Sequence, residues 1–301
     1  MLSQRLFFGA LMIAALLGLL YVDHHFAGPL QLGPRAIRHE GLVVALVLAV
    51  LAVMGTVEMG RLAEAAGHAP LRLWAAMSNY LVLMLLYFSH NGLLAPAIDS
   101  GPGGLTLAWL IVTFLGTAIL IAARERVQRS ISDLAVSLLI VVYLGLMPTF
   151  LLRIRMEGSV GLLLFFVASV KCCDIGAYFT GRYLGRHKLI PWLSPGKTIE
   201  GLVGGVMFSG LVALGLARLG LTDIPMSHSE SVSLPPVSAF AFGAVIGLIG
   251  QGGDLLESLF KRDAEAKDSS SALPAFGGVL DILDSLLPAA PLAYAYLIQW
   301  R

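Results

Sequence analysis

Carboxylates with the spacing of a helix face gather near the C-terminus of the chain. Asp254 and Glu257 are three residues apart, and so are Asp281 and Asp284. Residues at this spacing share one side of a helix. Carboxylates held together repel one another unless a cation lies between them, and a few hard oxygen ligands suit Mg²⁺ shared with the phosphates of a nucleotide. The pattern therefore predicts a Mg²⁺ site and leaves a second cation open.

Basic residues in the same segment allow a different interpretation. Ser258 and Lys261 continue the face of the first carboxylate pair, and Arg262 and Lys267 follow. These cations alone could hold the acids in a mesh of salt bridges. The glycine pair at 277–278 favours the ligand site, because a glycine turn lets a ligand approach the backbone closely and a mesh would not need one.

A second polar cluster lies upstream, in residues 171–205. Lys171 and Asp174 share a helix face near the end of an apolar run, where facing each other lowers the cost of burying either charge. The segment "SPGKTIEG" that follows lacks the first glycine of a phosphate loop. Ser194 can instead cap the next helix, with the proline after it in the first turn. The free N–H groups of that turn and the charge of Lys197 then predict an anion site.

The elements that must position these residues are membrane helices. The 301 residues are 57% hydrophobic and 13% charged, with a mean hydropathy of +0.83, whereas a soluble domain carries about 25% charged residues. A net charge of +1 offers no electrostatic basis for binding nucleic acid. Apolar runs long enough to cross a bilayer cover 6–22, 41–60, 73–89, 104–123, 132–152, 159–180, 200–220, 237–257 and 284–300. We therefore expect an all-α polytopic membrane protein of about nine transmembrane helices, with the active site in the C-terminal half at the cytoplasmic side.

The distribution of Lys and Arg predicts the orientation. The loops 181–199 and 258–283 are rich in these residues, and the loops 90–103 and 221–236 have none. Because positive loops stay inside, we expect the N-terminus and both polar loops on the cytoplasmic side of the cell (inner) membrane.

Polar residues are unevenly divided along the chain. Residues 1–158 hold few intramembrane polar groups and are expected to form a scaffold of transmembrane helices. Residues 159–301 are expected to form the catalytic transmembrane region, and the two parts together one integral membrane domain.

The C-terminal segment resembles the signature of the phosphatidate cytidylyltransferases (CDP-diacylglycerol synthases), which runs S-x-x-K-R-x4-K-D-x-x-x-x-x-P-G-H-G-G-x-x-D-R-x-D. The positions that match in type and spacing are Ser258, Lys261, Arg262, Lys267, Asp268, Pro274, Gly277, Gly278, Asp281 and Asp284. The upstream cluster is similar to that family's D-x-x-A-Y-x-x-G-x-x-x-G segment, from Asp174, and to its S-P-x-K-T-x-E-G segment, from Ser194. The N-terminal half matches in hydropathy alone.

The chain departs from this signature in two places. Ala275 and Phe276 stand where the family has Gly-His, and Ile282 stands where it has Arg. If the family's His or Arg contacts substrate phosphate, another cation such as Lys197 or Arg262 must replace it here, or activity is reduced or altered.

The resemblance implies transfer of a cytidylyl group from CTP to phosphatidic acid, giving CDP-diacylglycerol and pyrophosphate for phospholipid biosynthesis. It implies a Mg²⁺-dependent nucleotidyltransferase whose partners are CTP, phosphatidic acid and membrane lipids. Glycine-rich helix faces are also compatible with a homodimer.

The resemblance further implies roles for individual residues. The expected catalytic residues are Asp254, Asp281, Asp284, Lys261, Lys267 and Asp268, with Asp254, Asp281 and Asp284 as metal ligands. The expected substrate-binding residues are Ser194, Lys197, Thr198, Glu200, Ser258, Arg262, Gly277, Gly278, Asp174 and Tyr178. Tyr178 equally suits an aromatic residue at the membrane interface.

Three alternatives remain open at this point. A CTP-dependent polyprenol or lipid kinase would share the helices and the nucleotide but transfer a phosphate. A transporter should show paired halves with broken helices, whereas this chain concentrates its polar residues in one half. A non-catalytic relative would bind lipid or nucleotide without turning it over.

Overall fold

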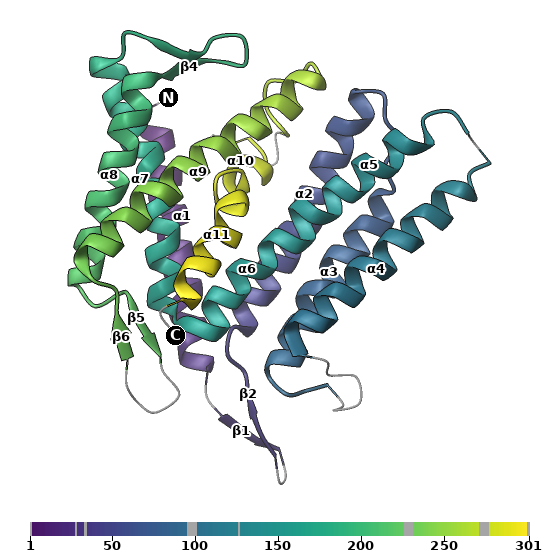
Figure 1. Cartoon of the computed structure of the whole chain (residues 1–301), viewed down its shortest axis with the longest axis horizontal. Helices are drawn as coiled ribbons and strands as arrows, with labels where there is room; N and C mark the ends of the chain where they lie inside the picture. Colours follow the sequence, from purple (N-terminus) through teal and green to yellow (C-terminus); the bar gives the residue numbers. More distant parts are fainter. Residues whose placement is uncertain are drawn as a thin grey trace. The chain divides into compact units, whose positions relative to one another are not determined.

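The computed structural model is built mainly of long helices, as the sequence predicts, with three short antiparallel strand pairs in the connections (Figure 1). It describes residues 2–27, 29–32, 35–94, 101–125, 127–225, 231–270 and 277–299. Within this described part, nine helical stretches are long and apolar enough to cross a membrane: Gly9–Phe26, Leu42–Ala65, Arg72–His90, Gly103–Ala122, Ser130–Gly158, Val160–Leu184, Ile199–Arg218, Pro236–Asp263 and Leu280–Ile298. Each overlaps one predicted run, so the expectation of a multi-pass membrane protein is confirmed.

The chain forms two compact units. The first comprises Met1–Leu152 and Ala264–Leu280, and the second comprises Arg153–Asp263 and Asp281–Arg301. The elements of the first unit are α1 (Leu2–Phe26), the antiparallel pair β1 (Pro29–Leu32) and β2 (Arg35–Arg38), α2 (Leu42–Ala65), α3 (Arg72–His90), α4 (Gly101–Ala122), α5 (Ser130–Val141) and most of α6 (Met147–Arg153).

Hydrogen bonds between side chains join the helices of the first unit. Asn79 Nδ2 on α3 donates to Thr56 Oγ1 on α2 over 2.9 Å. Ser78 on α3 lies 2.8 Å from Thr113 Oγ1 on α4, and Trp74 Nε1 donates to Thr117 Oγ1 over 3.0 Å. In hydrocarbon, where hydrophobicity does not drive helices together, such bonds are one of the forces that associate them.

The fifth predicted span is a single helical stretch with two wide turns. A π-helical turn at Val142–Leu146 joins α5 to α6, and a second one at Ile154–Gly158 ends the stretch. Pro148 lies just after the first of these turns. A proline has no N–H and its ring clashes with the carbonyl four residues earlier, and a widened turn relieves both problems.

The second unit holds the polar clusters. Its elements are α7 (Val160–Leu184), the antiparallel pair β3 (Lys188–Ile190) and β4 (Ser194–Thr198), α8 (Ile199–Arg218), the antiparallel pair β5 (Asp223–Pro225) and β6 (Ser231–Ser233), α9 (Pro236–Asp263), most of α10 (Leu280–Leu283) and α11 (Leu286–Ile298). In Figure 1, α7, α8 and α9 lie side by side, and α11 packs against α9.

Small residues allow α7, α8 and α9 to approach closely. A Cβ atom at Gly205 of α8 would lie 2.7 Å from the carbonyl oxygen of Cys173 on α7, and one at Gly243 of α9 would lie 2.7 Å from that of Ser209 on α8. Ser209 Oγ lies 2.6 Å from both the Ser169 and the Gly243 carbonyl oxygens. The glycine faces predicted from the sequence are therefore helix contacts within the chain, and they fix the helices that carry the polar residues.

Candidate active site

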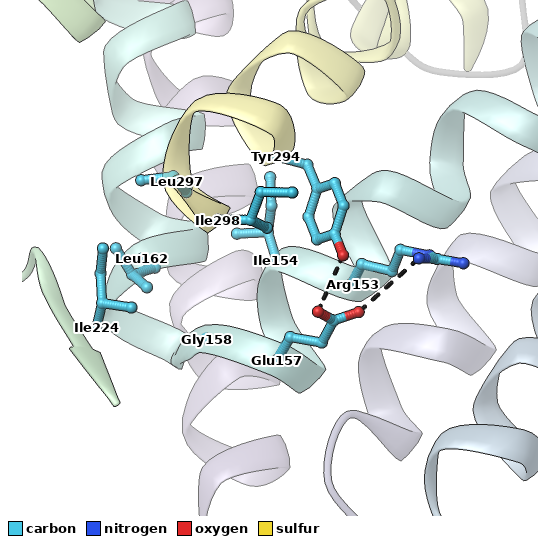
Figure 2. Close-up of a pocket in the computed structure, with 9 residues that line it drawn as sticks. All are labelled: Arg153, Ile154, Glu157, Gly158, Leu162, Ile224, Tyr294, Leu297 and Ile298. Carbon is cyan, nitrogen blue, oxygen red and sulfur yellow. Dashed lines mark hydrogen bonds and ion pairs between the residues drawn. The ribbon is translucent and has the colours of Figure 1, made fainter. Parts of the chain in front are cut away.

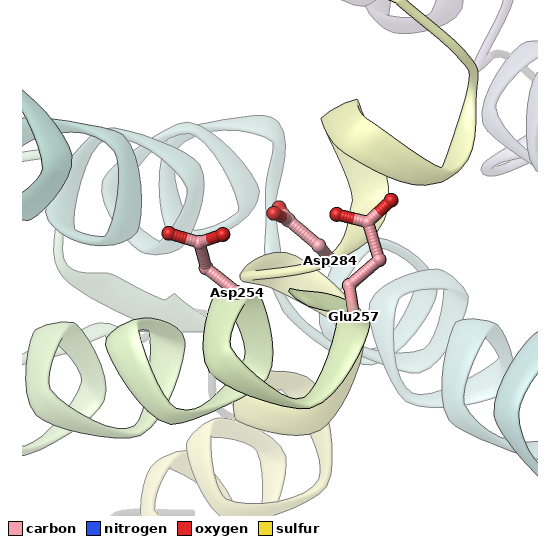
Figure 3. Close-up of side chains that lie close together, drawn as sticks. All are labelled: Asp254, Glu257 and Asp284. Atoms are coloured by element: carbon pink, nitrogen blue, oxygen red, sulfur yellow. The ribbon is translucent and has the colours of Figure 1, made fainter. Parts of the chain in front are cut away.

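Three carboxylates of the second unit converge in space. Asp254 and Glu257 lie one turn apart on α9, and Asp284 lies in the turn between α10 and α11. One carboxylate oxygen from each lies within 4.8 Å of the other two, and Figure 3 shows the three side chains close together. Glu257 is 1% exposed and Asp284 is 7% exposed, whereas Asp254 is half-buried. We call these three residues the acidic cluster.

Lysines from three elements pair with these acids. Lys197 Nζ on β4 lies 2.7 Å from Asp254 Oδ2, and Lys261 Nζ on α9 lies 2.9 Å from Glu257 Oε2. Lys171 Nζ on α7 lies 3.8 Å from Asp284 Oδ1. Each buried charge therefore has an opposite charge beside it, which removes much of the cost of burying it.

Two further aspartates share these lysines. Lys261 Nζ lies 2.7 Å from Asp281 Oδ1, and Lys171 Nζ lies 3.8 Å from Asp174 Oδ2. The helix-face pair Lys171–Asp174 predicted from the sequence is therefore present. Salt bridges and a carboxylate cluster also coexist here, although the sequence posed them as alternatives.

One oxygen of the acidic cluster has no donor among the residues that the structure describes. Glu257 Oε1 is buried, and within the described part of the chain no group makes a hydrogen bond to it. A buried carboxylate oxygen without a partner costs free energy that a bound cation would recover. Three carboxylates in close range are also the ligand type that Mg²⁺ prefers. The residues present thus fit a hard divalent cation.

Polar neighbours hold the charged groups in place. Gln251 Nε2, on the same helix as Asp254 and Glu257, donates to Asp174 Oδ1 over 2.6 Å. Lys197 Nζ donates to the Gln251 carbonyl oxygen over 3.2 Å, and Lys171 Nζ donates to Ser285 Oγ over 2.6 Å. Gln251 was not singled out from the sequence, because its role depends on the packing of α7 against α9.

The predicted helix cap at Ser194 is wrong. Residues 194–198 form the strand β4, and α8 begins only at Ile199. Thr198 is the N-cap, and its Oγ1 accepts the Gly201 N–H over 3.1 Å. Ser194 pairs with Ile190 and Thr198 with Lys188 of β3, so the chain stays extended through 194–198 and the helix begins after Thr198, itself a good capping residue. Lys197 directly precedes this cap, and its Nζ pairs with Asp254.

Glu200 and Tyr178 contact neighbouring parts of the same unit. The Glu200 carboxylate accepts the Arg186 N–H over 3.0 Å and lies 2.6 Å from His187 Nδ1. It therefore fixes the connection between α7 and β3. Tyr178 is exposed, and its hydroxyl accepts a hydrogen bond from Arg182 over 2.7 Å.

The remaining expected residues fall on both units. Ser258 is half-buried on α9, and Arg262 Nε donates to the Leu193 carbonyl oxygen over 3.4 Å. Lys267 and Asp268 are exposed and belong to the first unit, so their grouping with the acidic cluster stays a prediction.

The glycine turn of the signature lies in the first unit. Gly277 has a φ of 91°, a left-handed conformation that favours glycine, and Gly278 is buried. Of the positions compared with the family signature, Pro274, Ala275 and Phe276 lie outside the described residues, and Ile282 is half-buried in α10.

A pocket elsewhere in the second unit carries no comparable chemistry (Figure 2). Its polar wall consists of Glu157, which accepts the Tyr294 hydroxyl over 2.9 Å and lies 4.0 Å from Arg153. Its other side chains are the aliphatic ones of Ile154, Leu162, Ile224, Leu297 and Ile298. No residue of the acidic cluster lines it.

These observations define a class: a multi-pass helical membrane protein whose polar site combines carboxylates with lysines. The chain belongs to the cytidylyltransferase family, whose model matches residues 3–300. A phosphatidate cytidylyltransferase of Chlamydia pneumoniae is 30% identical over 267 residues, which cover 85% of this chain and 82% of the relative. That of Chlamydia trachomatis serovar D is 29% identical over 269 residues, covering 86% and 84%. That of Staphylococcus aureus strain COL is 39% identical over 170 residues, covering 56% and 61%.

Membership extends beyond the motifs. The family match covers the N-terminal half, which the sequence alone related to the family only by hydropathy. The family resemblance drawn from the two C-terminal motifs is thereby confirmed.

Proposed function

We propose that this chain transfers the cytidylyl group of CTP to phosphatidic acid, releasing pyrophosphate and forming CDP-diacylglycerol for phospholipid biosynthesis. The observation that carries the proposal is the acidic cluster with its three lysines in a member of the cytidylyltransferase family. The names of the relatives support the choice of substrates.

The reaction exchanges one phosphorus–oxygen bond for another. A phosphate oxygen of phosphatidic acid forms a bond to the α-phosphorus of CTP, and the bond from that phosphorus to the β-phosphate oxygen breaks. The nucleophile is already anionic at neutral pH, so no strong general base is required. Positioning and neutralisation of charge carry most of the catalysis in reactions of this type.

The lysines of the site supply part of that neutralisation. We propose that Lys197 and Lys261 contact the phosphates of CTP, since both are held by carboxylates at the cluster. Lys267 is a further proposed phosphate contact, and Ser194, Thr198 and Arg262 are proposed to bind the nucleotide. Where the family has His and Arg, this chain has Phe276 and Ile282, and we propose that Lys197 or Arg262 supplies the missing positive charge.

The carboxylates are proposed to hold the cofactor. When bound, Mg²⁺ would neutralise charge on the phosphates, and Asp254, Glu257 and Asp284 would hold it. Asp281 stays a proposed ligand, and its 2.7 Å pair with Lys261 gives it a second task, which is to orient that lysine. Asp268 stays a proposed contributor from the loop.

We further propose that the polar loops face the cytoplasm of the cell membrane, where CTP is found, and that residues 159–301 supply most of the catalytic groups. A homodimer would need surfaces other than Gly243 and Gly247, because a side chain at either would meet Ser209 of the same chain. Light scattering of the purified protein in detergent tests for such a dimer.

Product labelling tests the reaction. Purified protein in detergent is given phosphatidic acid, Mg²⁺ and CTP labelled at either the α- or the γ-phosphate. We expect the α-label in the lipid phase and the γ-label in pyrophosphate. The γ-label in lipid would instead identify a kinase, and the absence of both labels from lipid would identify a non-catalytic relative.

A matched pair of variants ties the reaction to the site. Asp284→Asn should lower the rate at least a hundredfold, because it removes a buried charge of the acidic cluster. Asp263→Asn, the same change at an exposed position at the end of α9, should leave the rate within about twofold. Equal rates in the two variants would contradict the assignment of the site.

A further inference from the structure

A buried carboxylate of the first unit has no part in the chemistry proposed above. Glu58 lies on α2, in the half of the chain that the sequence predicts as scaffold, and it is 4% exposed. An ionised carboxylate is a pure acceptor with two oxygens, so its hydrogen-bond partners must all be donors. The donors to the Glu58 carboxylate therefore identify the part of the chain that this residue holds in place.

Four donors meet the Glu58 carboxylate. Ser270 Oγ lies 2.7 Å and the Val279 N–H nitrogen 3.1 Å from Oε1. The Leu280 N–H nitrogen lies 3.0 Å and Ser269 Oγ 3.4 Å from Oε2. Each oxygen thus accepts one hydroxyl and one backbone N–H. Because the donors come from residues 269–270 and 279–280, one side chain ties together both flanks of the segment between them.

The glycine turn is shaped by this contact. A Cβ atom on Gly278 would lie 2.5 Å from Glu58 Oε2 and would also collide with Ser269 Oγ. Any residue other than glycine would therefore push the carboxylate away from the two N–H groups that follow. The need for glycine at position 278 has a cause inside the protein, where the sequence suggested the approach of a ligand.

We infer that Glu58 is a positioning residue for the segment Gly277–Leu280, and through it for Asp281, which follows directly in the chain. The inference rests on the proposed function for its catalytic consequence. The two N–H groups at the start of α10 would otherwise be buried without acceptors, and hydrogen bonds to a charged acceptor are stronger than neutral ones. Glu58 thus holds the backbone at Val279 and Leu280, where α10 begins.

Hydrogen–deuterium exchange tests the contact without reference to activity. Glu58→Gln keeps the shape of the side chain but turns one acceptor oxygen into an NH₂ group, which would face donors. We expect the amides of Val279 and Leu280 to exchange about tenfold faster in a peptide covering 277–283. Glu64→Gln, on the same helix but exposed and paired with Arg72, should leave that peptide unchanged. Unchanged exchange in Glu58→Gln would overturn the inference.

Steady-state kinetics test the consequence for the reaction. We expect the KM for CTP to rise at least fivefold in Glu58→Gln, whereas a mere loss of folded enzyme would lower the apparent kcat and leave KM unchanged. Glu58→Asp, which keeps the charge on a shorter side chain, should give intermediate values of both KM and exchange, and it carries the test if Glu58→Gln does not fold. A KM equal to that of the native protein would overturn the positioning role.

The two measurements separate this inference from the proposed function. If the native protein shows no cytidylyl transfer, the proposed function fails, and the role of Glu58 in the reaction fails with it. The exchange experiment still decides whether Glu58 holds the segment. If transfer is present but neither KM nor exchange responds to Glu58→Gln, only the inference about Glu58 fails.

Discussion

Residues of the site differ in how completely their charges are satisfied. Asp254, Glu257 and Asp284 each have a lysine within 4.0 Å, but Glu257 keeps one buried oxygen that no group in the described part of the chain contacts by a hydrogen bond. Glu257 is therefore the residue at which a bound cation would gain most. It was seen in the sequence as part of a helix face but was not named as a ligand.

Glu257→Gln should change the metal requirement more than it changes the fold. We expect the Mg²⁺ concentration for half-maximal activity to rise at least tenfold, because the variant loses a charge and offers a weaker ligand. A titration of activity against Mg²⁺ measures it, with Glu265→Gln, an exposed position after α9, as the control. An unchanged metal requirement would show that Glu257 is not a ligand.

Local spacing predicted some of these contacts and could not predict others. The pairs Lys171–Asp174 and Glu257–Lys261 lie within one helix and follow from its geometry. The pairs Lys197–Asp254 and Lys171–Asp284 join residues far apart in the chain, and they depend on how α7, β4, α9 and α11 pack. The contacts of Glu58 were missed for the same reason: nothing near it in the sequence distinguishes it from an interfacial acid.

At the scale of elements, the close packing of the helices positions the residues of the site. The hydrophobic runs predicted each of the nine apolar helical stretches in the described part of the chain, since a run of apolar residues is a strong signal. They did not predict the π-helical turn before Pro148, where a single proline alters the local backbone, or the strand β4, which depends on pairing with β3.

Two glycines of α8 should respond oppositely to the same change. Gly205→Ala should destabilise the protein by about 2 kcal/mol or more, because the added methyl group meets the Cys173 carbonyl oxygen and Ala177. Gly215→Ala meets nothing within 4 Å, and alanine favours helix, so it should be neutral or slightly stabilising. Thermal unfolding in detergent compares them. A stable Gly205→Ala protein would contradict the close packing of α7 and α8.

The whole molecule is organised by membrane crossings. If each of the nine apolar helical stretches in the described part of the chain crosses the membrane, successive loops lie on alternate sides, and the distribution of Lys and Arg predicts which side each loop faces. We therefore expect activity to depend on the loops 181–199 and 258–283 lying on the side where the nucleotide is.

Reporter fusions should reveal this alternation. We expect a reporter inserted after residue 190 or residue 268 to lie on the cytoplasmic side and to respond only to a reagent supplied there. A reporter inserted after residue 97 or residue 228 should respond only to a reagent supplied on the opposite side. The charge asymmetry of the loops is the physical reason. The same side for residues 190 and 228 would contradict the predicted orientation.

The hydrogen bonds of Glu58 also have a consequence for biosynthesis. Its partners lie 211 to 222 residues further along the chain. At about 5–20 residues per second, a ribosome needs roughly 10–40 s to make that stretch. Until residues 269–280 have been made, the Glu58 carboxylate of α2 has none of these four donors. The first unit can therefore reach its final packing only late in translation.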